Sequence, residues 1–287
     1  MTASETIGLA LGSGGARGIA HIVVLETLDD LGLRPSVIAG SSIGAIAGAA
    51  RCAGLSGADL RGYLLERLAS RVLLVRDVMA SRASGLENLF SLSNNPVLLD
   101  AGRVAAKFLP EAVPARFEDL DIPLITVATD FYGRCPRIFE TGALHPALAA
   151  SMAIPGVFRP MEMDGRLLVD GGLTNPLPFD LLAAQADIVI AVNVNGAADS
   201  NDAAPAQMPR PIDALFASVQ IMAHAITDAK IARYSPAIVL SPKVEQFRVL
   251  DFLQAEAILA ASEPLREELK RALDVLLGGS RKLLPGR

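Results

Sequence analysis

The chain has few cysteines, histidines and aromatic residues, and it has no tryptophan. Its 287 residues include two cysteines and three histidines. Two cysteines, Cys52 and Cys135, are too few for a disulfide framework, so we expect a reducing compartment and interpret both as ordinary small core residues. No group of His, Cys, Asp or Glu has the spacing of metal ligands. We therefore predict no metal site and no cofactor.

The sequence also lacks a membrane span, a signal peptide and a surplus of basic residues. The longest uncharged runs, such as Thr141 to Phe158, are interrupted by His, Pro and Gly. Met1 to Glu5 has no positive charge, and Ile7 to Leu11 is too short for the apolar core of a signal peptide. The net charge of −5 gives no reason to expect nucleic-acid binding. We expect a cytoplasmic protein, peripheral at a membrane surface if it meets one.

The apolar residues follow a repeated pattern of strand, glycine-rich turn and helix. With 51% hydrophobic residues, the chain can bury a full core. Short apolar runs predict buried strands at Ile7 to Leu11, Val37 to Ala39, Leu124 to Thr129, Ile188 to Val194 and, as a weaker candidate, Ala237 to Leu240. Helices are expected at Ile19 to Leu31, after Gly44 to about Ala53, at Pro178 to Gln185 and at Gln254 to Leu277. Alternating strands and helices predict an α/β fold with a mainly parallel central sheet.

The composition favours a single domain over residues 1–287, with its core at about 7–194. Residues 196–210 are rich in Ala, Asp, Asn and Pro and predict a loop. A C-terminal helical part is expected at 211–280, followed by a frayed basic tail at 281–287. Val78 to Leu99 mixes small polar residues with Leu, Phe and Val, and we interpret it as a candidate lid; the alternative is an ordinary packed helix pair.

The segment Gly40-Ser41-Ser42-Ile43-Gly44 has the pattern of a nucleophile elbow. A serine in the strained turn between strand and helix needs neighbours without Cβ atoms, which would collide with the backbone. The turn also places the hydroxyl at a helix N-terminus, where partial positive charge favours an anion. Ser42 is the predicted nucleophile, because Ser41 lacks glycine at both required offsets.

Residues 12–18, Gly-Ser-Gly-Gly-Ala-Arg-Gly, form a second glycine-rich turn between a strand and a helix. A dinucleotide-binding fingerprint would need glycine at Arg17 and an acidic residue after the second strand, and the chain has neither. We therefore interpret the turn as an oxyanion hole, in which backbone N–H groups approach the negative oxygen of a tetrahedral intermediate. Arg17 would add positive charge nearby; the alternative is a solvated cation at the helix end.

Asp170 follows the apolar run Leu167 to Val169 and precedes Gly171 and Gly172. A carboxylate at a strand end, on a flexible turn, can reach the same sheet edge as Ser42. Without that partner the motif would be an ordinary turn signal.

Together these motifs resemble the patatin-like phospholipases, most closely the small bacterial members. The similarity runs from about Ile7 to Val194 and is carried by Gly8 to Gly18 with Ala20-His21, by Ala39 to Ala45, Ile122-Pro123-Leu124, Ala128-Thr129-Asp130, Ala150 to Phe158, Asp170-Gly171-Gly172 and Asn175-Pro176-Leu177-Pro178. The resemblance implies a three-layer patatin-like fold and hydrolysis of lipid esters. The apolar composition and the segment Val78 to Leu99 predict that the protein meets its substrate at a membrane or micelle surface.

The resemblance also implies a Ser–Asp dyad. Ser42 would match the nucleophile of the family and Asp170 its base, while Gly14 and Gly15 would match its oxyanion donors. The family signature often has glycine where this chain has Ser13, and we expect the backbone N–H of Ser13 to be available to the oxyanion as well. Partial desolvation of Asp170 would raise its basicity.

Two other interpretations stay open at the level of sequence. An α/β-hydrolase triad would use His224, which follows Ser42 and Asp170 in the right order but lies in an apolar, helical-looking run. His21 and His145 are expected to be structural. Alternatively, the fold could serve as a catalytically silent regulatory or binding module, although the complete set of motifs argues against it.

Overall fold

The computed structural model describes residues 5–69, 98–195, 208 and 211–277. The candidate lid at Val78 to Leu99 lies outside these ranges except for its last two residues. Nearly all of the predicted loop at 196–210 and the whole predicted tail at 281–287 also lie outside them.

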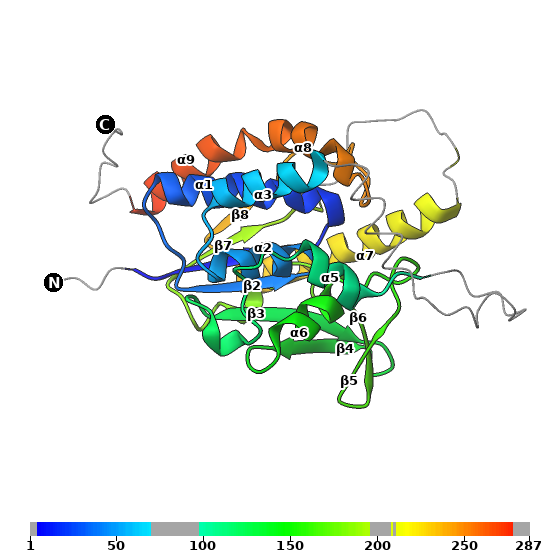
Figure 1. The fold of residues 1–287 in the computed structure, drawn as a ribbon. Coiled ribbons are helices and arrows are strands. Elements are labelled where there is room, and N and C mark those ends of the chain that lie inside the picture. Colours follow the sequence, from blue (N-terminus) through cyan, green and yellow to red (C-terminus); the bar gives the residue numbers. More distant parts are fainter. Residues whose placement is uncertain (1–4, 70–97, 196–207, 209–210, 278–287) are drawn as a thin grey trace, which may run out of the picture.

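The described residues form one mixed sheet of eight strands in the order β5-β6-β3-β2-β1-β7-β8, with β4 paired to β3 (Figure 1). The strands are β1 (Ile7–Leu11), β2 (Val37–Ser41), β3 (Leu124–Asp130), β4 (Cys135–Phe139), β5 (Met161–Met163), β6 (Arg166–Asp170), β7 (Ile188–Val192) and β8 (Ile238–Leu240). Strands β3, β2, β1, β7 and β8 run parallel, whereas β4 and β6 pair antiparallel with β3. The predicted α/β class with a mainly parallel sheet is confirmed.

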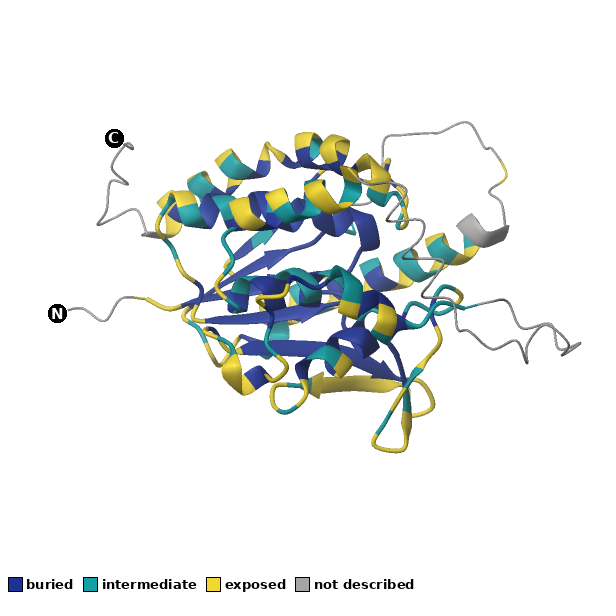
Figure 2. Ribbon diagram, viewed as in Figure 1, coloured by how far each residue is buried: buried dark blue, intermediate teal, exposed yellow. Residues whose placement is uncertain are grey.

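The parallel strands are apolar because both faces of the sheet are covered. In β1, Leu9 and Leu11 point into the larger core cluster, and Ala10 between them points into a second cluster on the opposite face. Figure 2 shows these central strands as buried, whereas β4 at the edge is exposed along most of its length. Cys52 is buried as expected, but Cys135 lies on β4 and is exposed, so the expectation that it belongs to the core was wrong.

Helices cover both faces and give the fold its three layers. The helices are α1 (His21–Asp30), α2 (Ile43–Cys52), α3 (Gly57–Ala69), α5 (Ala101–Phe108), α6 (Leu144–Ser151), α7 (Pro211–Tyr234), α8 (Ala255–Ser262) and α9 (Leu265–Leu277). Short 3₁₀ helices are η1 (Gly15–Ala20), η3 (Phe117–Asp119), η4 (Gly171–Leu173), η5 (Phe179–Leu181) and η6 (Phe252–Gln254). All α-helices except α7 contribute to the larger cluster. Ile231 of α7 and the turn around Phe179 pack on the other face.

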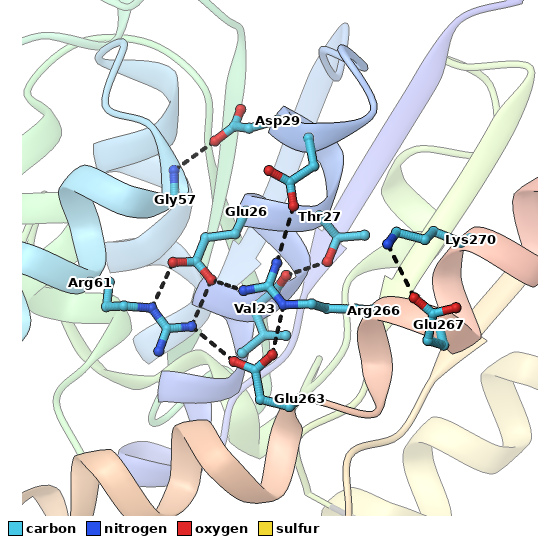
Figure 3. A network of polar contacts seen from close by, with 11 residues as sticks. Val23, Glu26, Thr27, Asp29, Gly57, Arg61, Glu263, Arg266, Glu267 and Lys270 are labelled. Atoms are coloured by element: carbon cyan, nitrogen blue, oxygen red, sulfur yellow. Dashed lines mark hydrogen bonds and ion pairs between the residues drawn. The ribbon is translucent and has the colours of Figure 1, made fainter. Parts of the chain in front are cut away.

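A polar network joins the C-terminal helices to the N-terminal half (Figure 3). Glu26 of α1 binds Arg61 of α3 at 2.6 Å and also binds Arg266 of α9. Glu263, between α8 and α9, accepts from both arginines, at 3.2 Å from Arg61 and 2.7 Å from Arg266. Because the network is partly shielded from solvent, its ion pairs are stronger than isolated surface pairs.

The structure differs from the predicted elements at three places, and a proline explains the break in one of them, at Pro264. The helix predicted from Pro178 to Gln185 is only the single 3₁₀ turn η5, and the one predicted from Gln254 to Leu277 is broken into α8 and α9 at Pro264. Proline lacks the N–H that would continue the ladder of helical hydrogen bonds. The α-helix predicted from Ile19 begins instead at His21, after η1.

The parallel strands bring the predicted motifs to one edge of the sheet. The carboxyl ends of β1 and β2 lead directly into Gly12 and Ser42, and β7 leads into Asn193. In open α/β sheets, ligands bind outside the carboxyl ends of the strands. We therefore expect a functional site at this edge of the sheet.

Candidate active site

Ser42 occupies a strained turn between β2 and α2. Its φ of 54° and ψ of −123° lie in a region that residues with side chains rarely adopt. A Cβ atom at Gly40 would lie 2.5 Å from the Cα of Ala45, and one at Gly44 would lie 2.1 Å from the carbonyl oxygen of Leu11. The two glycines are thus required by close backbone approach, as the elbow pattern predicts.

The hydroxyl of Ser42 donates a hydrogen bond to Asp170 Oδ2 over 2.5 Å. Strand pairing explains the meeting, because Ser41 lies opposite Val127 on β3 and Asp170 lies opposite the next residue, Ala128. The other carboxylate oxygen, Oδ1, accepts from the N–H of Gly172 at 2.7 Å. The two residues that the sequence analysis singled out are therefore in direct contact.

Burial changes the acidity of Asp170. Desolvation raises its pKa to about 6, although the hydrogen bonds from Ser42 and Gly172 act in the opposite direction. A carboxylate with this pKa is a better proton acceptor than an ordinary aspartate and is still mostly ionised at neutral pH.

Gly171 and Gly172 allow Asp170 to approach the elbow. A Cβ atom at Gly171 would lie 2.1 Å from the carbonyl oxygen of Val127, and one at Gly172 would lie 2.6 Å from Ser13 Oγ. The turn that carries the carboxylate is therefore packed tightly between β3 and the glycine-rich loop, and it is not a flexible surface turn.

Ser151, at the end of α6, also contacts the nucleophile residue and was not assigned a role from the sequence. Its hydroxyl accepts from the backbone N–H of Ser42 at 2.9 Å and donates to the carbonyl oxygen of Val127 at 2.6 Å. The side chain is fully buried. The only signal in the sequence was its place in the motif Ala150 to Phe158.

The glycine-rich loop presents two N–H groups that have no acceptor among the described residues, those of Gly14 and Gly15. The neighbouring N–H groups are occupied: Ser13 donates to the carbonyl oxygen of Pro176 and Ala16 to that of Val249, both at 2.8 Å. The expectation that the N–H of Ser13 is available to an oxyanion is therefore wrong. The reason is a hydrogen bond between distant segments, which the local pattern does not reveal.

The expected role of Arg17 is also corrected. Its buried guanidinium donates from Nε to the carbonyl oxygen of Phe247 at 2.7 Å and from Nη2 to that of Glu245 at 3.1 Å. Arg17 does not line the pocket that contains Ser42. It binds the backbone of the segment before α8, so it is neither an oxyanion ligand nor a solvated cation.

A pocket with a cavity volume of about 120 Å³ opens above Ser42, Asp170, Gly14 and Gly15. Its wall is mainly apolar, and α7 contributes more residues to it than any other element. The other lining residues are Ser13, Ile154, Pro155, Gly172, Leu173, Asn195, Leu215, Phe216, Val219, Gln220, Ala223 and Val249. Such a wall suits an acyl chain next to a reacting ester.

None of the three histidines contacts the hydroxyl of Ser42. His224 Nε2 lies 3.3 Å from Asp228 on the same helix, α7. His21 is fully buried against the carbonyl oxygen of Gly12 at 2.9 Å, and burial lowers its pKa to about 4. His145 lies 3.2 Å from the carbonyl oxygen of Val113.

Two features are absent from the described residues. No three His, Cys, Asp or Glu side chains gather there in a way that could hold a metal ion. No helix in that part of the chain is both long and apolar enough to cross a membrane.

The chain is similar to several known proteins. An uncharacterized NTE family protein of Mycobacterium bovis is 38% identical over 216 residues, which cover 73% of this chain and 54% of the relative. Human patatin-like phospholipase domain-containing protein 6 is 34% identical over 203 residues, which cover 69% of this chain and 14% of that protein. The chain thus spans about half of the mycobacterial relative and a small part of the human one.

A solved structure, VipD from Legionella pneumophila, aligns with 93% of this chain and 67% of its own at a TM-score of 0.45 and 14% sequence identity. The family model of the patatin-like phospholipases matches residues 9–183. That match covers more than half of the 287 residues and includes both Ser42 and Asp170. The chain therefore belongs to the patatin-like phospholipase family.

Proposed function

We propose that this protein hydrolyses carboxylic ester bonds of lipids, with phospholipids or lysophospholipids as substrates. The observation that carries the proposal is the hydrogen bond from Ser42 to buried Asp170 at the floor of an apolar pocket. Family membership supports it, as do the names of relatives, which include a phospholipase domain-containing protein and a neuropathy target esterase.

In the first half of the proposed reaction, Asp170 Oδ2 takes the proton of the Ser42 hydroxyl while Oγ attacks the ester carbonyl carbon. The carbonyl oxygen becomes an oxyanion and accepts from the N–H groups of Gly14 and Gly15. Donors of this kind are worth roughly 3–4 kcal/mol each to the transition state. When the tetrahedral intermediate collapses, the proton on Asp170 passes to the leaving alcohol and an acyl-enzyme remains.

In the second half, Asp170 accepts a proton from water, and the hydroxide oxygen attacks the acyl carbon. The same two N–H groups stabilise the second oxyanion. Ser42 Oγ leaves with the proton held by Asp170, and a free fatty acid is released. One carboxylate thus acts as base and as acid in turn, which a pKa of about 6 allows.

The substrate proposal follows from the pocket wall. Leu215, Phe216 and Val219 of α7 present apolar side chains to the cavity, and the acyl chain would lie along them. The polar headgroup would stay at the mouth. We further propose that the protein works in the cytoplasm as a peripheral protein that meets its lipid at a membrane or micelle surface.

The test is a hydrolysis panel of phospholipids, lysophospholipids, glycerides and short p-nitrophenyl esters, run beside labelling with a fluorophosphonate probe. We expect labelling at Ser42 and turnover of at least one lipid ester. A folded protein that neither labels nor hydrolyses any of them would favour the silent binding module instead.

A further inference from the structure

The segment between β8 and α8, residues 241–254, exposes two leucines and contributes one residue to the wall of the pocket. Leu250 and Leu253 are 50% and 56% exposed, and Val249 next to them lines the pocket. On the α7 side, pocket-lining Leu215 is 54% exposed. Large apolar side chains exposed on a segment that also lines a pocket indicate an interaction surface.

The same segment carries two cations without an acidic partner among the described residues, Lys243 and Arg248, both exposed. The acids Glu245 and Asp251 lie close enough to Arg17 for Coulombic attraction. The backbone N–H of Arg248 is also bound by Asp251 Oδ2 at 2.9 Å. The positive charges of Lys243 and Arg248 are therefore available to an anionic partner.

This segment is fixed directly to the glycine-rich loop of the active site. Arg17 binds two of its carbonyl oxygens, those of Phe247 at 2.7 Å and Glu245 at 3.1 Å. Ala16, next to Gly15, donates to the carbonyl oxygen of Val249 at 2.8 Å. A molecule that binds the segment would thus lie against the entrance to the site.

We propose that residues 241–254 form the surface on which an anionic lipid bilayer docks. Leu250 and Leu253 enter the headgroup region, while Lys243 and Arg248 bind anionic headgroups. A bilayer is the occupant that fits, because the surface combines exposed apolar side chains with unpaired cations and continues into an apolar pocket. The proposal rests on the proposed function, since a lipid hydrolase must draw its substrate from the bilayer into that pocket.

Docking can be measured without hydrolysis by sedimenting the Ser42→Ala protein with phosphatidylcholine vesicles that contain phosphatidylglycerol. We expect the added pair Leu250→Ser and Leu253→Ser to weaken binding about tenfold. The matched control is Val275→Ser with Leu276→Ser, two residues that are 84% and 45% exposed at the far end of α9 (Figure 1). The control pair should bind as the parent does, and equal binding by both pairs would overturn the proposal.

Two further measurements test the role of the cations and distinguish docking from catalysis. The pair Lys243→Gln and Arg248→Gln should weaken binding to anionic vesicles roughly tenfold and change binding to pure phosphatidylcholine much less. With Ser42 intact, the two leucine substitutions should leave turnover of a monomeric p-nitrophenyl ester unchanged. Loss of that turnover would assign the leucines to the catalytic site and overturn docking. If the unmodified protein hydrolyses no ester but its binding to vesicles still needs these residues, the proposed function fails and docking stands.

Discussion

The hydroxyl of Ser151 accepts a hydrogen bond from the backbone N–H of Ser42 at 2.9 Å, although the two residues are 109 positions apart in the sequence. The amide of the proposed nucleophile is therefore occupied, and the strained elbow is tied to β3 through the bond from Ser151 to Val127. A strained turn persists only when its surroundings constrain it.

We predict that Ser151→Ala lowers kcat about 10- to 100-fold and changes KM little. The N–H of Ser42 and the carbonyl oxygen of Val127 would each lose a hydrogen bond, which costs about 1–3 kcal/mol. The substitution would disturb the orientation of Ser42 and leave the pocket that binds the substrate unchanged. Steady-state kinetics on a soluble ester provides the measurement. Ser218→Ala is a suitable control, because that exposed hydroxyl only donates within α7. Equal kinetics for the two variants would argue against a positioning role.

Ser42→Ala should lose ester hydrolysis by several orders of magnitude while the protein stays folded. Among the described residues the hydroxyl of Ser42 makes a hydrogen bond only to Asp170, and alanine keeps the Cβ atom in place, so the protein should stay folded. Turnover and fluorophosphonate labelling are measured on the same purified preparation. Substantial turnover by the folded variant would refute the assignment of the nucleophile.

The dyad and triad mechanisms predict different activities for a variant that lacks His224. We predict that Asp170→Asn is inactive, because an amide has no useful basicity. His224→Ala should stay within about tenfold of the unmodified enzyme, or roughly 1.4 kcal/mol of barrier, because His224 faces Asp228 on α7. The two variants are compared by kcat/KM on one ester, and a folded but inactive His224→Ala would favour the triad.

Activity should fall on the acid side as Asp170 becomes protonated. Its pKa is raised to about 6, and only the ionised form can accept the proton of Ser42. We expect kcat/KM to drop about tenfold per pH unit below that value and to level off above about pH 7. The profile is recorded with an ester whose leaving group does not titrate in this range. A flat profile down to pH 4.5 would be inconsistent with Asp170 as the base.

The same pKa has a consequence for stability. Because the pKa of Asp170 is about 6 in the folded state and about 3.9 in an unfolded chain, the native protein binds the proton more tightly. The burial cost of the ionised carboxylate is present above pH 6 and disappears as the pH falls toward 4.

We therefore predict that Asp170→Asn is more stable than the unmodified protein at pH 8, by up to roughly 3 kcal/mol, and that the gain shrinks to near zero by about pH 4. Urea unfolding at several pH values measures it. Asp228→Asn, at an exposed carboxylate, is the control and should show no such gain. A pH-independent difference would contradict the linkage.

The sequence alone was sufficient for the elements whose signal is local. The runs that became β1, β2, β3 and β7 are apolar because both faces of the sheet are covered, and that burial shows in the residues themselves. The signal for the elbow around Ser42 is equally local, because its glycines are required by close contacts with neighbouring backbone.

Other elements depend on partners that a local pattern does not contain. Strands β4 and β5 are short, partly exposed additions at the sheet edge, so no run of apolar residues predicted them. Helix α7 lies inside the C-terminal part that was expected to be helical, but its bounds were not predicted, because its apolar residues are spread over its faces and some of them line the pocket.

The amino-acid sequence by itself determined the fold class, the elbow and the identity of the residue pair Ser42 and Asp170. Only the tertiary structure decided that Ser151 holds the nucleophile's amide, that the N–H of Ser13 is occupied and that Arg17 binds Phe247 instead of an oxyanion. The physical reason is range: Arg17 and Phe247 are 230 residues apart in sequence, and their hydrogen bond exists only once β8 and the segment after it have packed against the sheet.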